Sequence, residues 1–264
     1  MTAILPHVVA RALGSRHGVY LDTNAWSELA KSKIPIEPLK KWLDCRAQTL
    51  VITRFSIGEL SRDDRLARGA ASLIAALDVV FADLGTNDLS GRRRQDVPYE
   101  LLVRLTPNSD AAKQELIKLF ENQQIRKTML DLDEDAANWK KRIEKSVAAK
   151  VNWTWGDFQA VLRHFVEGTC VASGREFFES AFDDPDCYVG MKLAFGVVFA
   201  RYFIAKKKFS PSDYLDFLHC SDMAYFETIV TESGLCEAIS QAQRRMCGNQ
   251  INRVFKLRWL SAPT

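Results

Sequence analysis

Four acidic residues of this sequence occupy positions from which their carboxylates could act together on a cation. Asp22 and Glu232 each come directly after a short apolar run, GVYL and TIVT. Glu59 lies in the first helical turn after the run LVIT, and Asp216 lies among Leu and Phe side chains in SPSDYLDFLH. If the three runs are strands of one parallel sheet, their carboxyl ends meet at one edge, where such sheets place ligands.

Carboxylates that gather at one edge repel one another unless a cation neutralises them. Sites made of oxygen ligands select Mg²⁺ or Mn²⁺ over Zn²⁺. A metal ion held in this way lowers the pKa of a bound water and offsets negative charge on a phosphate. The pattern therefore predicts metal-assisted hydrolysis of phosphodiester bonds.

Two of these acids also have a simpler structural interpretation. Aspartate is a preferred helix N-cap, so Asp22 could simply begin a helix, although Thr23 or Asn24 could supply that cap instead. Glu59 stands three residues after Ser56, which is the spacing of a capping box. Both interpretations stay open beside the functional one.

The last acidic block offers more than one candidate. Asp213 and Asp216 are three residues apart and share one face of a predicted helix. Asp213 lies in the first turn, where the helix dipole favours acids on its own. Asp216 lies deeper, in an apolar neighbourhood that a solvated helix face does not explain. Glu232 occupies the same strand-end position as Asp22, but it could also be an ordinary loop glutamate.

The elements that must position these residues alternate between strands and helices in two blocks of the chain. We expect strands at 18–21, 50–53, 79–84, 228–231 and 253–257, with 79–84 open to being the continuation of a helix. We expect helices at 24–32, 36–44, 55–61, 63–77, 212–225 and 233–246. This alternation predicts an α/β fold with a central parallel sheet and helices on both faces.

The middle of the chain shows helical patterns without strands. After a loop at 85–98, we expect helices at 99–105, 110–127, 133–149, 155–168, 173–181 and 188–205. We therefore predict one α/β core, formed by 1–98 and 206–264, that carries a large all-helical insertion at 99–205. Two domains in series are the alternative, but the last block would then be too small to bury a core of its own.

Composition narrows the functional classes. The chain has 264 residues, a net charge of +3 and a pI of about 8.5, which is too mild to indicate nucleic-acid binding by itself. The longest apolar stretch, 191–205, is interrupted by Lys192 and Arg201, and the N-terminus has no signal-peptide pattern. We expect a cytoplasmic protein that does not span a membrane. Six scattered cysteines without a CxxC pair argue against a zinc framework.

Local basic residues are the candidates for phosphate contacts. They are Arg54 near the end of the second strand, the loop residues Arg92, Arg93 and Arg94, and the run Lys206, Lys207 and Lys208. Each basic run could equally be a solvated loop.

Three other side chains have two interpretations. Trp153 and Trp155 could stack on bases, although aromatic residues two apart near a helix start usually belong to a core. We expect His219 to be a packed helix residue rather than a catalyst.

Three segments, YLDTNAW, VITRFSIGEL and DFLHCSDMAYFETIVTES, together resemble the motifs of the PIN-domain nuclease superfamily. The resemblance covers roughly 17–85 and 211–260. It implies a three-layer α/β/α fold with a parallel sheet. It also implies cleavage of single-stranded or structured RNA with Mg²⁺ or Mn²⁺ held by three or four acids.

Carried over residue by residue, the resemblance makes Asp22, Glu59 and Asp216 metal ligands and catalytic residues. Glu232 takes the place of a fourth acid that is often Asp, and Ser233 or Asp213 could complete the site instead. Thr231 or Asn24 could support the ligands by hydrogen bonding.

Two further functions stay open at this stage. The chain could be a catalytically degenerate binding or scaffold module on the same fold, or a metal-dependent nuclease that acts on DNA. The helical insertion could gate the site, bind a regulator or mediate oligomerisation, and its length is unlike that of small toxin-type members of the superfamily.

Overall fold

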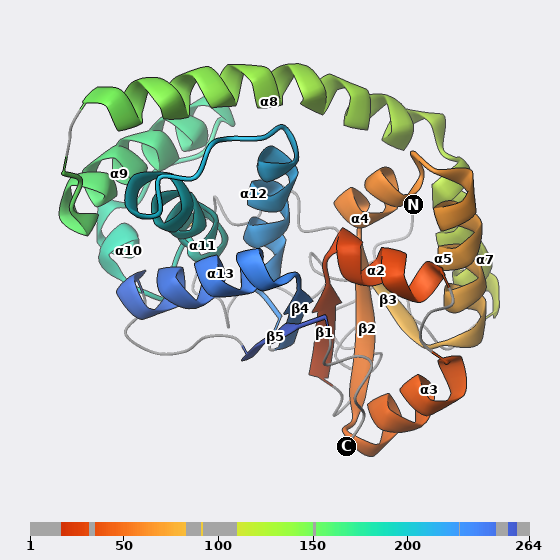
Figure 1. Ribbon diagram of the computed structural model, residues 1–264. Coiled ribbons are helices and arrows are strands. Elements are labelled where there is room, and N and C mark those ends of the chain that lie inside the picture. Colours follow the sequence, from red (N-terminus) through yellow and green to blue (C-terminus); the bar gives the residue numbers. More distant parts are fainter. Residues whose placement is uncertain are drawn as a thin grey trace.

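The computed structural model describes residues 17–31, 35–82, 91, 110–149, 152–226, 228–246 and 253–257. It shows a mixed α/β chain whose central sheet has five strands, all parallel, in the order β3-β2-β1-β4-β5 (Figure 1). The strands are β1 (His17–Leu21), β2 (Gln48–Thr53), β3 (Val79–Ala82), β4 (Thr228–Thr231) and β5 (Arg253–Lys256). The expected parallel sheet is confirmed, and the segment that could have continued a helix is the strand β3.

Both faces of the sheet are covered, because successive side chains of each strand enter different hydrophobic clusters. On β1, Val19 and Leu21 pack into one cluster and Tyr20 packs into the other. Helices on the Val19 face are α2 (Thr23–Ala30), α3 (Ile36–Cys45), α4 (Arg54–Leu60), α5 (Asp64–Ala76) and α7 (Asp110–Lys118). Helices on the Tyr20 face are α9 (Trp155–Ala172), α10 (Glu179–Asp183), α11 (Val189–Val198), α12 (Ser212–Met223) and α13 (Ser233–Met246). This layering suits a parallel sheet, whose strands are buried on both faces.

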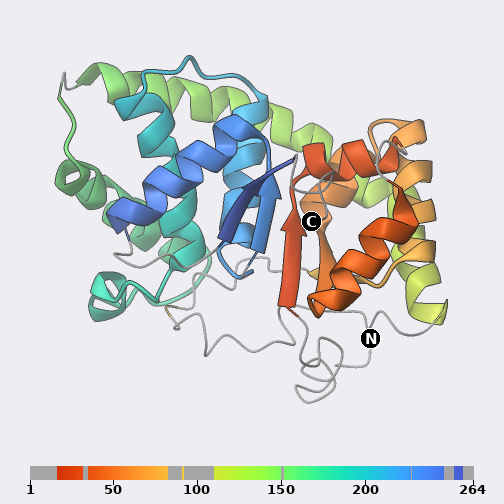
Figure 2. The same cartoon turned by 60° about the horizontal axis from the view of Figure 1, so that its bottom comes forward.

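The middle helices share the Tyr20-side cluster with the sheet. α11 packs against α12 and α13, and residues of α9, α11 and α13 join strand residues in one cluster. Figure 2 shows these helices gathered beside β4 and β5. In the part of the chain that is described, no helix is both long and apolar enough to cross a membrane.

The long helix α8 (Gln123–Ala149) bridges the two sides of the molecule (Figure 1). It contacts α4 near one end and α12 further along, and Ile125 and Ile143 belong to opposite hydrophobic clusters. The Arg62 guanidinium donates to the Met129 carbonyl at 2.7 Å, which ties α8 to the turn after α4. α8 therefore braces α4, which carries Glu59, and α12, which carries Asp213, Asp216 and His219.

Helix boundaries in the middle segment differ from the expected ones. The pattern predicted helices at 110–127 and 133–149, but the chain breaks at Asn122, after α7 and the 3₁₀ turn Leu119–Glu121. Asn122 has extended backbone and its side chain accepts from the Ile125 N–H at 3.4 Å, so it begins α8 in the manner of an N-cap.

Two other helix predictions need correction or fall outside the described residues. The helix expected at 173–181 is wrong, because Gly174 ends α9 at a φ of +65° and α10 starts only at Glu179. The stretch expected at 188–205 is α11 followed by a π-helix, Phe199–Ile204. The helix expected at 99–105 lies outside the described residues, as does all of the expected loop at 85–98 except Gly91.

Candidate active site

Asp22 joins the ends of β1 and β4. Its Oδ1 accepts the Ala25 N–H at 2.7 Å, so it is the N-cap of α2, and the alternatives in which Thr23 or Asn24 supplied that cap are wrong. Its Oδ2 accepts the Thr231 hydroxyl and, at 3.3 Å, the Glu232 N–H. One carboxylate thus begins a helix and also ties together two strand ends that are adjacent in the sheet.

The charge of Asp22 is poorly compensated. The residue is 3% exposed, and burial raises the pKa of its carboxyl from 3.8 to about 6. The hydrogen bonds from Thr231 and Ala25 lower this pKa, but burial outweighs them. Its hydrogen-bond donors, within the part of the chain that the structure describes, are neutral groups. At neutral pH the site therefore holds a buried negative charge that an added cation would stabilise.

Glu59, on α4, pairs with His219 of α12. Its Oε2 accepts the Thr23 hydroxyl and lies 2.7 Å from the His219 Nε2, while the His219 Nδ1 lies 2.5 Å from the Tyr20 hydroxyl. Burial alone would raise the pKa of Glu59, but the contacts with His219 and Thr23 outweigh it and lower that pKa. Burial alone would lower the pKa of His219, but the Glu59 carboxylate outweighs it and raises that pKa. Glu59 is therefore an ionised carboxylate held in one orientation.

This pairing corrects one prediction and extends another. The capping box of Ser56 and Glu59 is wrong, because Thr53 is the N-cap of α4 and its side chain accepts the Ser56 N–H at 3.4 Å. The expectation that His219 is a packed helix residue is confirmed at 2% exposure, yet its ring also orients one of the four acids.

Asp216 and Asp213 of α12 share a cation that the chain itself supplies. The Arg201 Nη1 lies 2.6 Å from the Asp216 Oδ2 and 2.9 Å from the Asp213 Oδ1, and its Nη2 lies 3.5 Å from the Glu232 Oε1. Burial raises the pKa of Asp216, and Arg201 opposes that rise without cancelling it. The structure therefore gathers Asp216, Asp213 and Glu232 around one guanidinium.

Sequence reasoning overlooked Arg201 and treated it as an interruption of an apolar stretch. A usable signal was present, because a charged side chain in an otherwise apolar buried helix must be paired. Lys192, the other interruption, obeys the same rule: it is 7% exposed and its Nζ donates to the Asp184 carbonyl at 2.6 Å.

The predicted phosphate-binding residues lie in different places. Lys207 donates to the Asp213 Oδ1 at 2.7 Å, which puts it beside the acidic group. Lys206 and Lys207 also line a cavity of about 270 Å³ between α8 and the segment after the π-helix. Arg54 is exposed at the first position of α4. Arg92, Arg93 and Arg94 lie outside the described residues.

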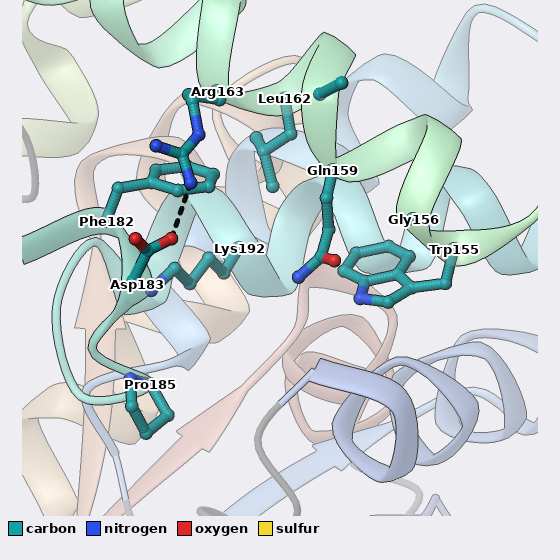
Figure 3. Close-up of a pocket in the computed structure, with 10 residues that line it drawn as sticks. Trp155, Gly156, Gln159, Leu162, Arg163, Phe182, Asp183, Pro185 and Lys192 are labelled. Atoms are coloured by element: carbon teal, nitrogen blue, oxygen red, sulfur yellow. Dashed lines mark hydrogen bonds and ion pairs between the residues drawn. The ribbon is translucent and has the colours of Figure 1, made fainter. Parts of the chain in front are cut away.

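A second cavity, of about 340 Å³, lies among α9, α10 and α11 (Figure 3). Two of the residues that line it, Arg163 and Lys192, are already engaged, with Arg163 paired to Asp183 at 2.5 Å. Trp155 lines the same cavity but packs on Phe199 at 5.3 Å between ring centroids, in line with the core interpretation of this tryptophan. None of the four predicted acids lines this cavity, so it is a separate feature.

The acidic side chains at the sheet edge offer oxygen atoms, the kind of ligand that Mg²⁺ and Mn²⁺ take. Among the described residues, no three His, Cys, Asp or Glu side chains are already grouped to hold a metal ion. Glu59 is engaged by His219, and Arg201 engages both Asp216 and Glu232. Both oxygens of Asp22 accept hydrogen bonds from neutral donors. Mg²⁺ usually keeps several waters and takes one or two protein carboxylates.

Comparisons with known proteins found no similar protein. No family model matches the chain, and no match was found among curated proteins or among solved structures.

Proposed function

We propose that this chain is a PIN-like, metal-dependent nuclease that hydrolyses phosphodiester bonds, with RNA as its first substrate. The observation that carries the proposal is the Asp22 carboxylate, 3% exposed and bonded to neutral donors at the edge where β1 and β4 end. A buried carboxylate with a raised pKa at a ligand-binding edge is a typical feature of a functional site.

The topology supports the same proposal. The five-stranded parallel sheet, with β1 between β2 and β4, is compatible with the three-layer α/β/α fold that the PIN resemblance implies. Residues from the three resembling segments come together: Asp22 contacts the end of β4, and Glu59 of α4 contacts His219 of α12. Segments that are about 160 to 210 residues apart along the chain thus meet at one edge.

Each acid receives a role that follows from its present contacts. We assign Asp22 and Glu232 to hold Mg²⁺ or Mn²⁺ together with water. When bound, such an ion supplies a water of lowered pKa and positive charge opposite the phosphate. Glu59, ionised and oriented by Thr23 and His219, holds water at the site. Asp216 keeps Arg201 in place beside Glu232.

We assign substrate binding to three basic residues. Lys207 contacts Asp213 directly, Lys206 precedes it, and Arg54 is exposed where α4 begins. Lysine and arginine side chains bind phosphates without reading sequence, so RNA and DNA compete for the same residues.

Incubation of labelled single-stranded RNA and DNA with the purified chain and Mn²⁺ tests the proposal. We expect cleavage of RNA by the wild type, loss of cleavage in Asp22→Asn and Glu232→Gln, and restoration of the EDTA-treated wild type by Mn²⁺. Asp63→Asn is the matched control, because Asp63 is also an N-cap aspartate but is exposed on α5. Equal activity in all four proteins would sink the nuclease proposal, and cleavage of DNA alone would favour the DNA-directed alternative.

The second candidate is a catalytically degenerate binding module, and Arg201 is the observation in its favour. A buried guanidinium already neutralises acids that a metal-dependent reaction would otherwise use. A chain that binds RNA with equal affinity in EDTA and in Mn²⁺, and cleaves neither nucleic acid, would establish this alternative.

A further inference from the structure

A third cavity, of about 540 Å³, lies where α8 meets α9 and α12. Its volume falls in the range of about 300–1,000 Å³ that is typical of ligand-binding pockets. α8 contributes an aromatic ring and several polar and charged side chains, while α9 and α12 contribute one aromatic ring each, Phe165 and Tyr214. None of the four predicted acids lines this cavity, so it is distinct from the candidate active site.

Three half-buried aromatic rings line the cavity, one from each helix. The Trp139 ring of α8 packs on the buried Phe217 at 4.3 Å and on Tyr214 at 5.6 Å, measured between ring centroids. Phe165 of α9 packs on Phe195 at 4.7 Å. Core residues therefore support each ring, and part of its surface is left accessible. Firmly held, partly accessible rings of this kind are what nucleic-acid bases stack on.

Two exposed cations follow the tryptophan on α8. Neither Lys141 nor Arg142 pairs with any acid among the described residues, whereas the neighbouring Lys140 pairs with Glu144 at 3.9 Å. Asp135 is the one acid among the residues that line the cavity. Two positive charges against one negative charge leave the wall with a net positive charge, which suits a phosphate backbone.

Hydrogen-bonding groups lie next to the rings. Asp135, Asn138, Trp139 and Arg142 recur three and four residues apart, so they share one face of α8. The Asn138 amide can both donate and accept, as the edges of bases require. Burial, together with the Asp135 carboxylate, raises the pKa of Tyr214, so its hydroxyl stays protonated at neutral pH and can donate.

We propose that this cavity binds a single-stranded nucleic acid, with its bases stacked on Trp139, Phe165 and Tyr214 and its phosphates held by Lys141 and Arg142. A double helix keeps its bases stacked on one another and does not offer them to these rings. The inference rests on the proposed function in taking nucleic acid as the ligand. It deepens that function by assigning strand binding to α8, α9 and α12, and α12 also carries two of the candidate acids.

Removal of the two cations is the first test, with fluorescently labelled single-stranded RNA and anisotropy measured in EDTA at several salt concentrations. We expect Lys141→Ala/Arg142→Ala to bind more weakly and to reduce the slope of log affinity against log salt by about 1.4, or about 0.7 for each lost phosphate contact. The matched control is Lys40→Ala/Lys41→Ala, which removes two adjacent exposed cations from α3 on the other face of the sheet. Equal losses in the two double variants would overturn the inference.

The fluorescence of Trp139 reports stacking directly. We expect single-stranded RNA to quench tryptophan emission in the wild type. Trp139→Phe keeps an aromatic ring against Phe217, so it should still bind RNA but lose most of this quenching. Undiminished quenching in Trp139→Phe would overturn the inference, because the bases would then contact other tryptophans.

Two variants of Tyr214 separate the ring from the hydroxyl. We expect Tyr214→Leu to weaken RNA binding by about 5- to 150-fold, the range for one lost base–aromatic stack. Tyr214→Phe keeps the ring and should lose much less. Equal weakening in both variants would overturn the stacking role, and if Tyr214→Leu fails to fold, the cation pair and the Trp139 signal decide the question.

Binding in EDTA and cleavage in Mn²⁺ separate this inference from the proposed function. A wild type that binds single-stranded RNA through these residues but does not cleave it would overturn the proposed function and leave the cavity assignment standing. Cleavage by a wild type that binds single-stranded and double-stranded RNA equally well would overturn the inference and leave the proposed function standing.

Discussion

Replacing Asp22 with asparagine should make the metal-free protein more stable while removing its response to metal. Asparagine is as good an N-cap as aspartate, so the Ala25 N–H keeps its acceptor and α2 keeps its start. The variant removes the buried negative charge, which is the feature on which the proposed site depends.

The magnitude follows from the pKa of Asp22. Burial raises this pKa from 3.8 to about 6. A raised pKa in an acid means that the folded state binds a proton more tightly than the unfolded state does. The stability from this proton is present below pH 3.8 and is lost as the pH rises through about 6. Above that pH the charged carboxylate costs the folded state about 3 kcal/mol.

Asparagine recovers most of this cost. Its amide nitrogen cannot accept the Glu232 N–H, which loses its acceptor at a cost of about 1 kcal/mol. We therefore expect Asp22→Asn to raise the free energy of unfolding by about 2 kcal/mol at pH 8. At pH 5 the wild-type carboxyl is largely protonated in the folded state. The difference in free energy of unfolding between Asp22→Asn and the wild type should therefore be smaller by about 1.4 kcal/mol than at pH 8.

Urea denaturation in EDTA, followed by circular dichroism at pH 8 and pH 5, measures both quantities. Asp63→Asn serves as the control, because Asp63 caps α5 from an exposed position and its replacement should change little at either pH. Thermal denaturation with and without Mn²⁺ completes the assay, and only proteins that retain Asp22 should gain stability. An Asp22→Asn chain that is less stable than the wild type at pH 8, or a gap that does not depend on pH, would refute the reasoning.

Two further variants test the packing and the pairing around the site. A Cβ atom at Gly69 would lie 2.4 Å from the Ala30 carbonyl oxygen, so Gly69→Ala should push α2 and α5 apart and cost about 1–3 kcal/mol in urea denaturation. Gly168→Ala, at a helical position with no atom within 4 Å, should instead gain up to about 1 kcal/mol, and equal effects would contradict the close approach of α2 and α5. Glu59→Gln should lower the pKa of His219 in an NMR titration, because burial then acts without the carboxylate, and an unchanged pKa would contradict the contact.

The strands were predictable because their signal is local. Short apolar runs bounded by polar residues mark β1, β2 and β4. Such runs are typical of a parallel sheet, because its strands are buried on both faces. The position of Asp22 was predictable for the same reason, since an acid directly after a buried strand lies at the sheet edge. The PIN-like character of the sheet and the metal site remain predictions.

The partners of the acids were not predictable, because they are set by tertiary contacts. Nothing in the spacing of Glu59 distinguishes a capping box with Ser56 from a pair with His219, which is 160 residues further along the chain. Arg201, which pairs with Asp216, lies in a π-helix, and the wider turn of a π-helix changes the direction in which a side chain leaves the helix axis. A sequence pattern based on α-helical spacing therefore does not show that Arg201 faces Asp216. The sequence indicated where the acids lie relative to the strands, but only the three-dimensional structure shows which cations pair with them.

The pairing of β1 with β4 also determines when this site can exist. The hydrogen bond between Thr231 and Asp22 joins residues that are 209 positions apart in the sequence. During synthesis, a chain that has emerged as far as residue 205 contains Asp22 and Glu59, but the strand and the acids that complete the edge have yet to be made. Contacts of such long range form late and slowly. Until then β1 is paired only with β2, and the side of β1 that faces β4 in the finished sheet is an open edge. Any cleavage activity at this edge is therefore delayed until β4 and Glu232 have been synthesised.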